Sequence, residues 1–129
     1  MDEGPGQIRD YRDLIVWREA MEIAELVYLD TRAFPREELF GITSQMRRAA
    51  VSIPSNIAEG FGRAQRRTFI QFLRIAQGSL KELETQTILS RRIGFLSSEK
   101  AGELSVRYER LGKRLVQYVR SLDRSGIGE

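Results

Sequence analysis

Polar residues recur along two stretches of the sequence at spacings that would place them on one side of a helix. At 100° per residue the first set forms a stripe beside an apolar face, made up of Gln45, Arg48, Ser52, Asn56 and Glu59. The second stripe consists of Ser79, Glu82 and Gln86, and Gly78 just before it would allow another backbone to approach closely. The carboxylates of Glu59 and Glu82 are groups that could serve acid–base chemistry or bind a metal at a seam between two helices.

The same side chains also fit a hydrogen-bonded polar layer that fixes helix register or a subunit contact. Composition favours this second interpretation, because the 129 residues include neither histidine nor cysteine. The commonest general base, the commonest zinc ligand and any thiolate nucleophile are therefore absent. Di-metal helix bundles, moreover, rely on Glu-x-x-His pairs. We expect no enzymatic activity, no metal and no cofactor.

Pro54 breaks a local rule, because it stands inside a stretch whose apolar spacing is helical. A proline in a helix deprives the carbonyl four residues earlier, that of Ala50, of its partner, at a cost of about 3 kcal/mol. Ser52 and Asn56 lie one helical turn apart, where they could bond the freed backbone or a neighbouring helix. The motif therefore predicts a kink or local unwinding at Pro54, with Ser52 or Asn56 bonded to nearby backbone.

A basic cluster follows where the second and third predicted helices meet. It comprises Arg63, Arg66 and Arg67, with Arg47 and Arg48 earlier in the chain. Only three of the 21 basic residues are lysines, and arginine makes the forked contacts that suit phosphates, carboxylates and interfaces. The cluster is either a phosphate-binding patch or a solvated turn whose arginines pair with Glu37, Glu38 or the carboxylates of a neighbouring subunit.

Charge is distributed unevenly along the chain, although the net charge is only +3. Residues 1–35 carry four basic and eight acidic side chains, whereas residues 36–80 carry seven basic and three acidic ones. The arginine cluster lies in the basic segment, which is the part of the chain where an anionic partner would be attracted most strongly.

Four stretches carry apolar residues at steps of three and four, which is typical of amphipathic helices. They cover about residues 10–33, 36–61, 68–94 and 98–124. Phe34-Pro35 separates the first two stretches, and Gly60 and Gly62 are expected to end the second. No alternating strand pattern and no Asn-Gly hairpin turn occurs. Short links between long helices favour antiparallel neighbours, so the predicted fold class is all-α, an up-down-up-down four-helix bundle.

The length suits one domain, with a flexible N-terminal tail at residues 1–9, the bundle at 10–124 and a frayed C-terminus at 125–129. A second apolar set on the first helix lies outside the stripe that contains Trp17, and consists of Ile15, Ile23 and Leu26. A single bundle would leave much of this set exposed to solvent, which predicts a homo-oligomer. No run approaches the roughly 20 apolar residues of a membrane span, and no secretory signal is present. We therefore expect a cytoplasmic protein without a membrane partner.

Three segments of the sequence resemble the bacterial 23S rRNA intervening-sequence proteins, also called four-helix-bundle proteins. They are Phe34-Pro35 with Glu38–Ala50, the motif Val51–Arg63, and Phe72–Gln86. The resemblance extends over roughly Tyr11–Leu122, and it implies a four-helix bundle that assembles into a homopentameric ring or barrel with no established enzymatic activity. Some members are encoded within intervening sequences of large-subunit ribosomal RNA genes. The family is also similar in fold to the accessory variability determinant of diversity-generating retroelements, a basic pentamer that binds nucleic acid and a reverse transcriptase.

Two functions remain open from the sequence. The arginine-rich junction favours an oligomeric accessory protein that binds RNA or DNA through phosphates. The modest net charge and the polar stripes favour an oligomeric scaffold for an unidentified protein partner. Salt-sensitive nucleic-acid binding would separate the two.

Overall fold

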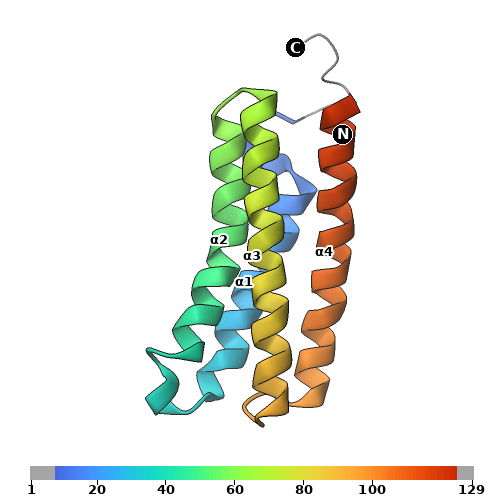
Figure 1. Cartoon of the computed structure of the whole chain (residues 1–129). Coiled ribbons are helices and arrows are strands. Elements are labelled where there is room, and N and C mark those ends of the chain that lie inside the picture. The colour runs from blue at the N-terminus through green and yellow to red at the C-terminus, as the bar shows by residue number, and fades with distance from the viewer. Residues whose placement is uncertain (1–7, 125–129) are drawn as a thin grey trace.

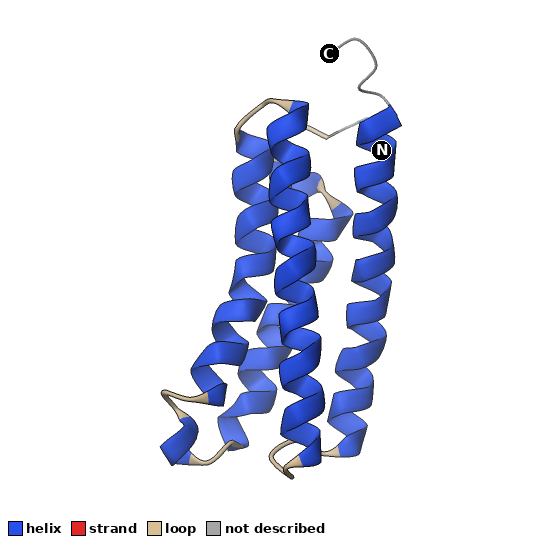
Figure 2. Cartoon of the chain, in the orientation of Figure 1, coloured by secondary structure: helices blue, strands red, loops and turns tan. Residues whose placement is uncertain are grey.

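Helices make up nearly all of the computed structural model, which describes residues 8–124. Within this part of the chain there is no strand, so the all-α fold class is confirmed (Figure 2). Four long helices are accompanied by three short 3-10 turns. In chain order they are η1 (Tyr11–Asp13), α1 (Ile15–Asp30), η2 (Thr31–Ala33), η3 (Arg36–Glu38), α2 (Ile42–Gly62), α3 (Arg66–Arg92) and α4 (Ser98–Arg124).

The four helices pack side by side around one core. α1 contacts α2 and α4, and α3 contacts the same two helices, with the most extensive packing between α2 and α3. The link from α2 to α3 lies at one end of the bundle, and the links from α1 to α2 and from α3 to α4 lie at the other (Figure 1). Each helix contributes fully buried side chains, among them Ile23, Ile57, Leu83 and Leu111.

Two side-chain hydrogen bonds lie within this core. The buried Tyr108 hydroxyl of α4 shares a 2.8 Å hydrogen bond with the hydroxyl of Thr87 in α3. Because the phenol is surrounded by apolar atoms, burial raises its pKa above the ordinary value of 10.0. Ser90 of α3 donates to the sulfur of Met46 in α2 over 3.4 Å. These bonds tie three helices together across the core.

The first two helices are shorter than the sequence predicts. Residues 10–33 divide into η1, α1 and η2, because Leu14 is extended (ψ 128°) and the backbone turns before α1 begins. The second helix begins at Ile42 rather than Arg36, because Gly41 adopts φ −109° and ψ −120°, outside the helical region. The boundaries of the last two helices lie close to those predicted, with Gly94 at φ +86° after α3 and Ser97 accepting from the Lys100 amide before α4.

The glycines of α2 and α3 agree with expectation only in part. Gly62 is the last residue of α2, as expected, but Gly60 lies inside the helix. It is buried, and a Cβ placed on it would lie 2.4 Å from the Cβ of Phe72 in α3. Gly78 faces open space instead, with no atom within 4 Å of the position of a Cβ. The close approach of α2 and α3 therefore occurs at Gly60, nearer the link between them.

The buried face of α1 also differs from the predicted one. Ile23 is fully buried in the core, together with Val16 and Val27, whereas Trp17 is only half-buried at the edge. The apolar residues of α1 cover more than half of its circumference, so periodicity alone left the phase of the core face ambiguous. Of the second apolar set, Ile15 is exposed and Leu26 is half-buried.

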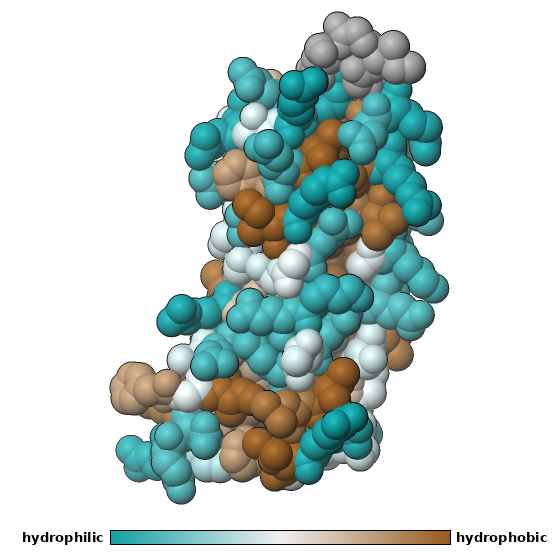
Figure 3. Space-filling view, in the orientation of Figure 1, coloured by the Kyte–Doolittle hydropathy of each residue, from teal (hydrophilic) through white to brown (hydrophobic). Residues whose placement is uncertain are grey.

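Apolar side chains also gather on the outer surface. Figure 3 shows the face over α2, α3 and α4, where apolar surface collects toward the end at which α3 leads into α4. The exposed apolar residues of α3 near this end are Ile88 and Leu89, followed by Ile93. Among residues 8–124 no helix is long and apolar enough to cross a membrane. The predicted tail at 1–9, apart from Ile8 and Arg9, and the predicted frayed end at 125–129 lie outside the described residues.

Candidate nucleic-acid interface

The link between α2 and α3 has an unusual backbone. Ala64 adopts φ +60°, a left-handed conformation that costs an alanine roughly 1–2 kcal/mol. Gln65 precedes the first turn of α3, but its side chain makes no capping hydrogen bond, and that turn contains no acidic residue. Neither the N-cap residue nor the first turn of α3 therefore supplies a carboxylate to the positive end of the helix dipole.

Three arginines surround this link. Arg63 donates to Glu59 Oε2 over 2.9 Å, and its guanidinium lies 5.3 Å from the ring centroid of Phe72. Arg66 is half-buried and also has an interaction of its own. Arg67 is exposed. The cluster is thus partly neutralised, and its carboxylate partner at Arg63 is Glu59 rather than Glu37 or Glu38.

The structure does not bring Arg47 and Arg48 to this cluster. Arg47 donates from Nε to the hydroxyl of Thr31 over 3.0 Å, and its guanidinium lies 4.7 Å from the ring centroid of Tyr28. It precedes Arg63 by sixteen residues of one helix, which is roughly 24 Å along the axis. Arg47 therefore connects α1 to α2 near the opposite end of the bundle, with the exposed Arg48 next to it.

The polar stripes meet at the seam between α2 and α3. The hydroxyls of Ser52 and Ser79 share a 2.8 Å hydrogen bond. The Asn56 amide donates to the carbonyl oxygen of Ser52 over 2.8 Å and to its hydroxyl over 3.0 Å, so the expected bonding to backbone is confirmed. These part-buried groups form a small polar layer that holds the two helices in one register.

Pro54 faces away from this seam, toward α1. α2 remains helical on both sides of Pro54, so of the two predicted outcomes, a kink or local unwinding, the unwinding does not occur. Instead the axis of α2 changes direction along its length (Figure 1). Proline removes one backbone bond and crowds the preceding turn, which is the ordinary cause of such a bend.

The two carboxylates of the stripes lie apart. The Ser52–Ser79 bond and the Gly60–Phe72 contact set the register between α2 and α3, and they place Glu59 beside Phe72. Glu82 lies ten residues further along α3, roughly 15 Å away. It accepts from the Gln86 amide over 3.3 Å, while the buried Gln86 carbonyl Oε1 has no hydrogen-bond partner among the described residues. Gln45 is exposed, and no cluster of potential metal ligands occurs among residues 8–124.

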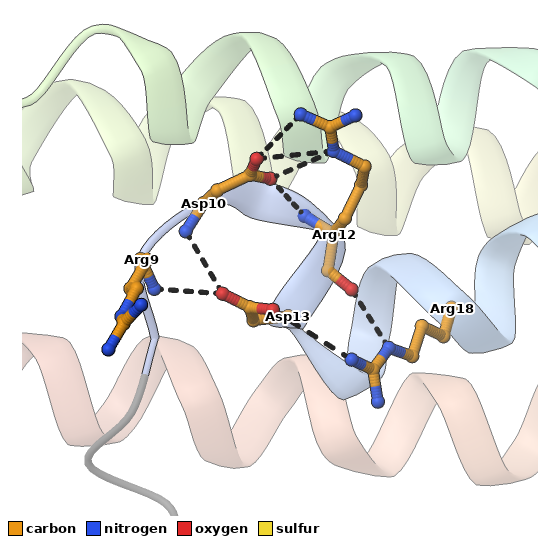
Figure 4. Close-up of polar contacts among 5 residues, drawn as sticks. All are labelled: Arg9, Asp10, Arg12, Asp13 and Arg18. Carbon is orange, nitrogen blue, oxygen red and sulfur yellow. Dashed lines mark hydrogen bonds and ion pairs between the residues drawn. The ribbon is translucent and has the colours of Figure 1, made fainter. Parts of the chain in front are cut away.

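A charged network at the start of the described chain was not foreseen (Figure 4). Asp10 accepts from the backbone amide and guanidinium of Arg12 at distances down to 2.7 Å, and these bonds lower the pKa of its carboxyl. Asp13 accepts from the backbone amides of Arg9 and Asp10, and Arg18 donates to the Arg12 carbonyl over 2.8 Å. The Asp-x-x-Asp spacing of residues 10–13 is a capping-box pattern that could have predicted it.

An apolar groove between α1 and α2 was also missed. It has a volume of about 740 Å³ and is lined by Tyr11, Trp17, Met21, Ala24, Glu25, Tyr28, Leu29, Arg32, Val51, Pro54, Ser55 and Ala58. Tyr11 is held at one end by the charged network, with its ring 5.3 Å from that of Trp17. Trp17 lies on an apolar stripe of the first predicted helix, a position typical of core residues, so the sequence does not reveal that it lines a groove.

Comparison with known proteins is consistent with this fold. The family described as 23S rRNA-intervening sequence protein matches residues 12–117. A crystal structure of a protein of unknown function, from the S23 ribosomal protein family of Bacteroides thetaiotaomicron VPI-5482, is similar with a TM-score of 0.74. The two sequences are 24% identical, and the match covers 81% of this chain and 98% of the other. At 24% sequence identity, this structural similarity shows a shared fold and nothing further about function. No curated protein matches the chain.

Proposed function

Because the chain belongs to the 23S rRNA-intervening sequence protein family, we propose that it is a non-enzymatic homo-oligomer that binds nucleic acid at the α2–α3 junction. In this proposal the bundle has the up-down-up-down order, five copies form a ring, and the protein acts in the bacterial cytoplasm. Arg63, Arg66 and Arg67 contact phosphates of RNA or DNA.

The first turn of α3 is the observation that supports this proposal. Arg66 and Arg67 stand there at the positive end of the helix dipole, where cations are unfavourable and anions are favoured. The Gln65 side chain makes no capping bond to this turn, and the backbone enters the turn through the strained Ala64. A phosphate would be bonded by backbone amides of the turn and by arginine forks together, which would offset the unfavourable placement of cations at a helix N-terminus.

Repetition around a ring would strengthen such a site. One partly neutralised cluster binds a single phosphate weakly, but five copies on one assembly would engage a long polyanion at several points. No base-reading helix enters the proposed contact, and the Arg63 guanidinium lies over the ring of Phe72, where a base would otherwise stack, so we expect little sequence preference.

Fluorescence anisotropy with labelled single-stranded RNA and double-stranded DNA tests the proposal. At low salt the wild type should bind both ligands, with log–log salt slopes near −0.7 per neutralised phosphate for the single strand and −0.9 for the duplex. Arg66→Glu/Arg67→Glu should abolish binding. Glutamate suits a helix N-terminus, so helicity and oligomer size should be retained.

The matched control is Arg91→Glu/Arg92→Glu, the same charge change at exposed residues in the last turn of α3. It should keep most of the affinity. Equal loss in both variants would show only a general effect of net charge, and absence of binding by the wild type at low salt would exclude the proposal. The alternative, a scaffold for protein partners, is favoured by the apolar α1–α2 groove and would then replace it.

A further inference from the structure

Phe40 is the most exposed of the large apolar residues in the described chain. Its side chain is 93% exposed, on the corner between η3 and α2 that projects from one end of the bundle (Figure 1). Leu39 beside it is half-exposed. A phenylalanine side chain that an ordered turn holds in water buries no apolar area and so does not stabilise its own chain. Insertion into an apolar site elsewhere would bury most of its ring.

The α1–α2 groove offers such a site. Its open wall includes Tyr28, Leu29 and Val51, which are between 42% and 49% exposed, and its volume of about 740 Å³ lies in the range of ligand-sized pockets. The chain does not fill this groove with its own Phe40, since that side chain is almost entirely exposed.

The charges beside the two features are complementary. Arg32 lines the groove and the Arg47 guanidinium lies over Tyr28 in its wall, against a single acidic lining residue, Glu25. The projecting corner carries two acidic residues, Glu37 and Glu38, against one arginine. We call this projecting corner the Phe40 knob. Its acidic residues would meet the basic residues beside the groove, and such complementary charges steer two copies together and fix their register.

We propose that Phe40 of one copy inserts into the α1–α2 groove of a second copy. The inference rests on the proposed homo-oligomer and specifies its interface. Knob and groove are different surfaces of the same chain, and in the proposed ring each copy donates its knob to one neighbour and receives a knob from another, which is a heterologous contact. Repetition of such a contact closes into a ring when the rotation allows it, whereas reciprocal insertion of both knobs would close a two-fold dimer.

Two variants, examined separately and then mixed, test this contact. Phe40→Ser removes the knob, and Val51→Glu places a charge in the exposed wall of the groove, where a helix tolerates glutamate well. Each variant alone should be monomeric by light scattering, with the dissociation constant between subunits raised about thirtyfold or more, as expected for loss of an aromatic hot spot. An equimolar mixture should form heterodimers and stop there, because each pair retains one intact knob and one intact groove.

The control is Val106→Ser on α4, which alters a comparably exposed apolar residue outside the groove and should leave the assembly unchanged. If the wild type is oligomeric and both variants remain so, the docking inference is overturned while the oligomer stands, and the groove has another occupant. If the variants dissociate but mixing restores nothing, Phe40 does not dock in the groove of another copy and the inference fails. A monomeric wild type would overturn the proposed oligomer itself.

Discussion

Gly60 of α2 and Phe72 of α3 lie so close together that no larger residue fits at Gly60. A Cβ added there would lie 2.4 Å from the Cβ and 3.1 Å from the Cγ of Phe72, and 3.1 Å from Cδ1 of Phe69. The position of a Cβ is fixed by the backbone, so a change of rotamer cannot relieve the overlap. The two helices must separate instead, and the adjacent arginine junction would move with them.

Gly60→Ala should therefore destabilise the protein by about 1–3 kcal/mol, the usual cost of overpacking a well-packed contact. Gly62→Ala is the matched control, since it lies in the same helix with no atom within 4 Å. Alanine loses less backbone entropy than glycine on folding, so this control should be about 0.4–1 kcal/mol more stable than wild type. Urea denaturation gives both values. Equal stabilities for the two variants would contradict the close contact.

The Ser52–Ser79 bond should contribute measurably to the register of α2 and α3. Ser52→Ala removes it together with one acceptor of Asn56, at an expected cost of about 0.5–1.5 kcal/mol after correction for helix propensity. Ser55→Ala, at an exposed position of α2, supplies that correction. The double variant Ser52→Ala/Ser79→Ala should cost less than the two single changes together, because both remove the same bond. Strict additivity would mean that the hydroxyls do not interact.

The number and order of the helices follow directly from periodicity, while their ends depend on local chemistry. Gly94 and Ser97 mark the link between α3 and α4 because a left-handed glycine and an N-cap serine act through adjacent backbone. The start of α2 was missed because an acidic pair after proline resembles an ordinary first turn. In the structure that pair closes the separate turn η3, and α2 begins only after Gly41.

The candidate site was predicted only in part. Arg63, Arg66 and Arg67 lie together because they are neighbours in sequence, and Ser52 meets Ser79 because both stripes lie beside apolar faces that must pack. The positions of Arg47 and Gly60 depend on which helix each face of α2 meets, and a single amphipathic pattern does not specify this. For the same reason the groove beside Trp17 emerges only from the three-dimensional arrangement of α1 and α2.

Asp30 should make the free energy of unfolding depend on pH in the acidic range. It is the last residue of α1, and burial raises its pKa above the ordinary 3.8, with partial opposition from Lys100. As the pH rises, the unfolded chain ionises at this residue first, so stability falls from about pH 3.8 up to the folded pKa. Asp30→Asn should then gain roughly 0.3–0.5 kcal/mol at pH 7, because a charge at a helix C-terminus is unfavourable but screened by solvent. Urea denaturation near pH 3 should show no gain; an equal gain at both pH values would exclude this origin.

Introduced cysteines should count the subunits of the proposed ring. The natural chain contains no cysteine, so Leu39→Cys with Val51→Cys supplies the only two thiols, one beside the Phe40 knob and one in the groove wall. Within one copy they cannot form a bond, because ten residues of α2 between Gly41 and Val51 span roughly 15 Å, well beyond the reach of a disulfide. Between neighbouring copies the proposed docking brings them together, and mild oxidation should produce a ladder on a non-reducing denaturing gel.

The ladder should end at five subunits, because a closed ring has no free end to extend, and the reductant dithiothreitol should collapse it to the single chain of 14.8 kDa. Either cysteine alone should yield at most a small fraction of dimer, since its partner thiol is missing from the contact. A ladder that ends at another number would correct the pentamer while retaining the docking, and one that continues without limit would indicate a filament. No ladder from an oligomeric double variant would place the subunit contact elsewhere on the bundle.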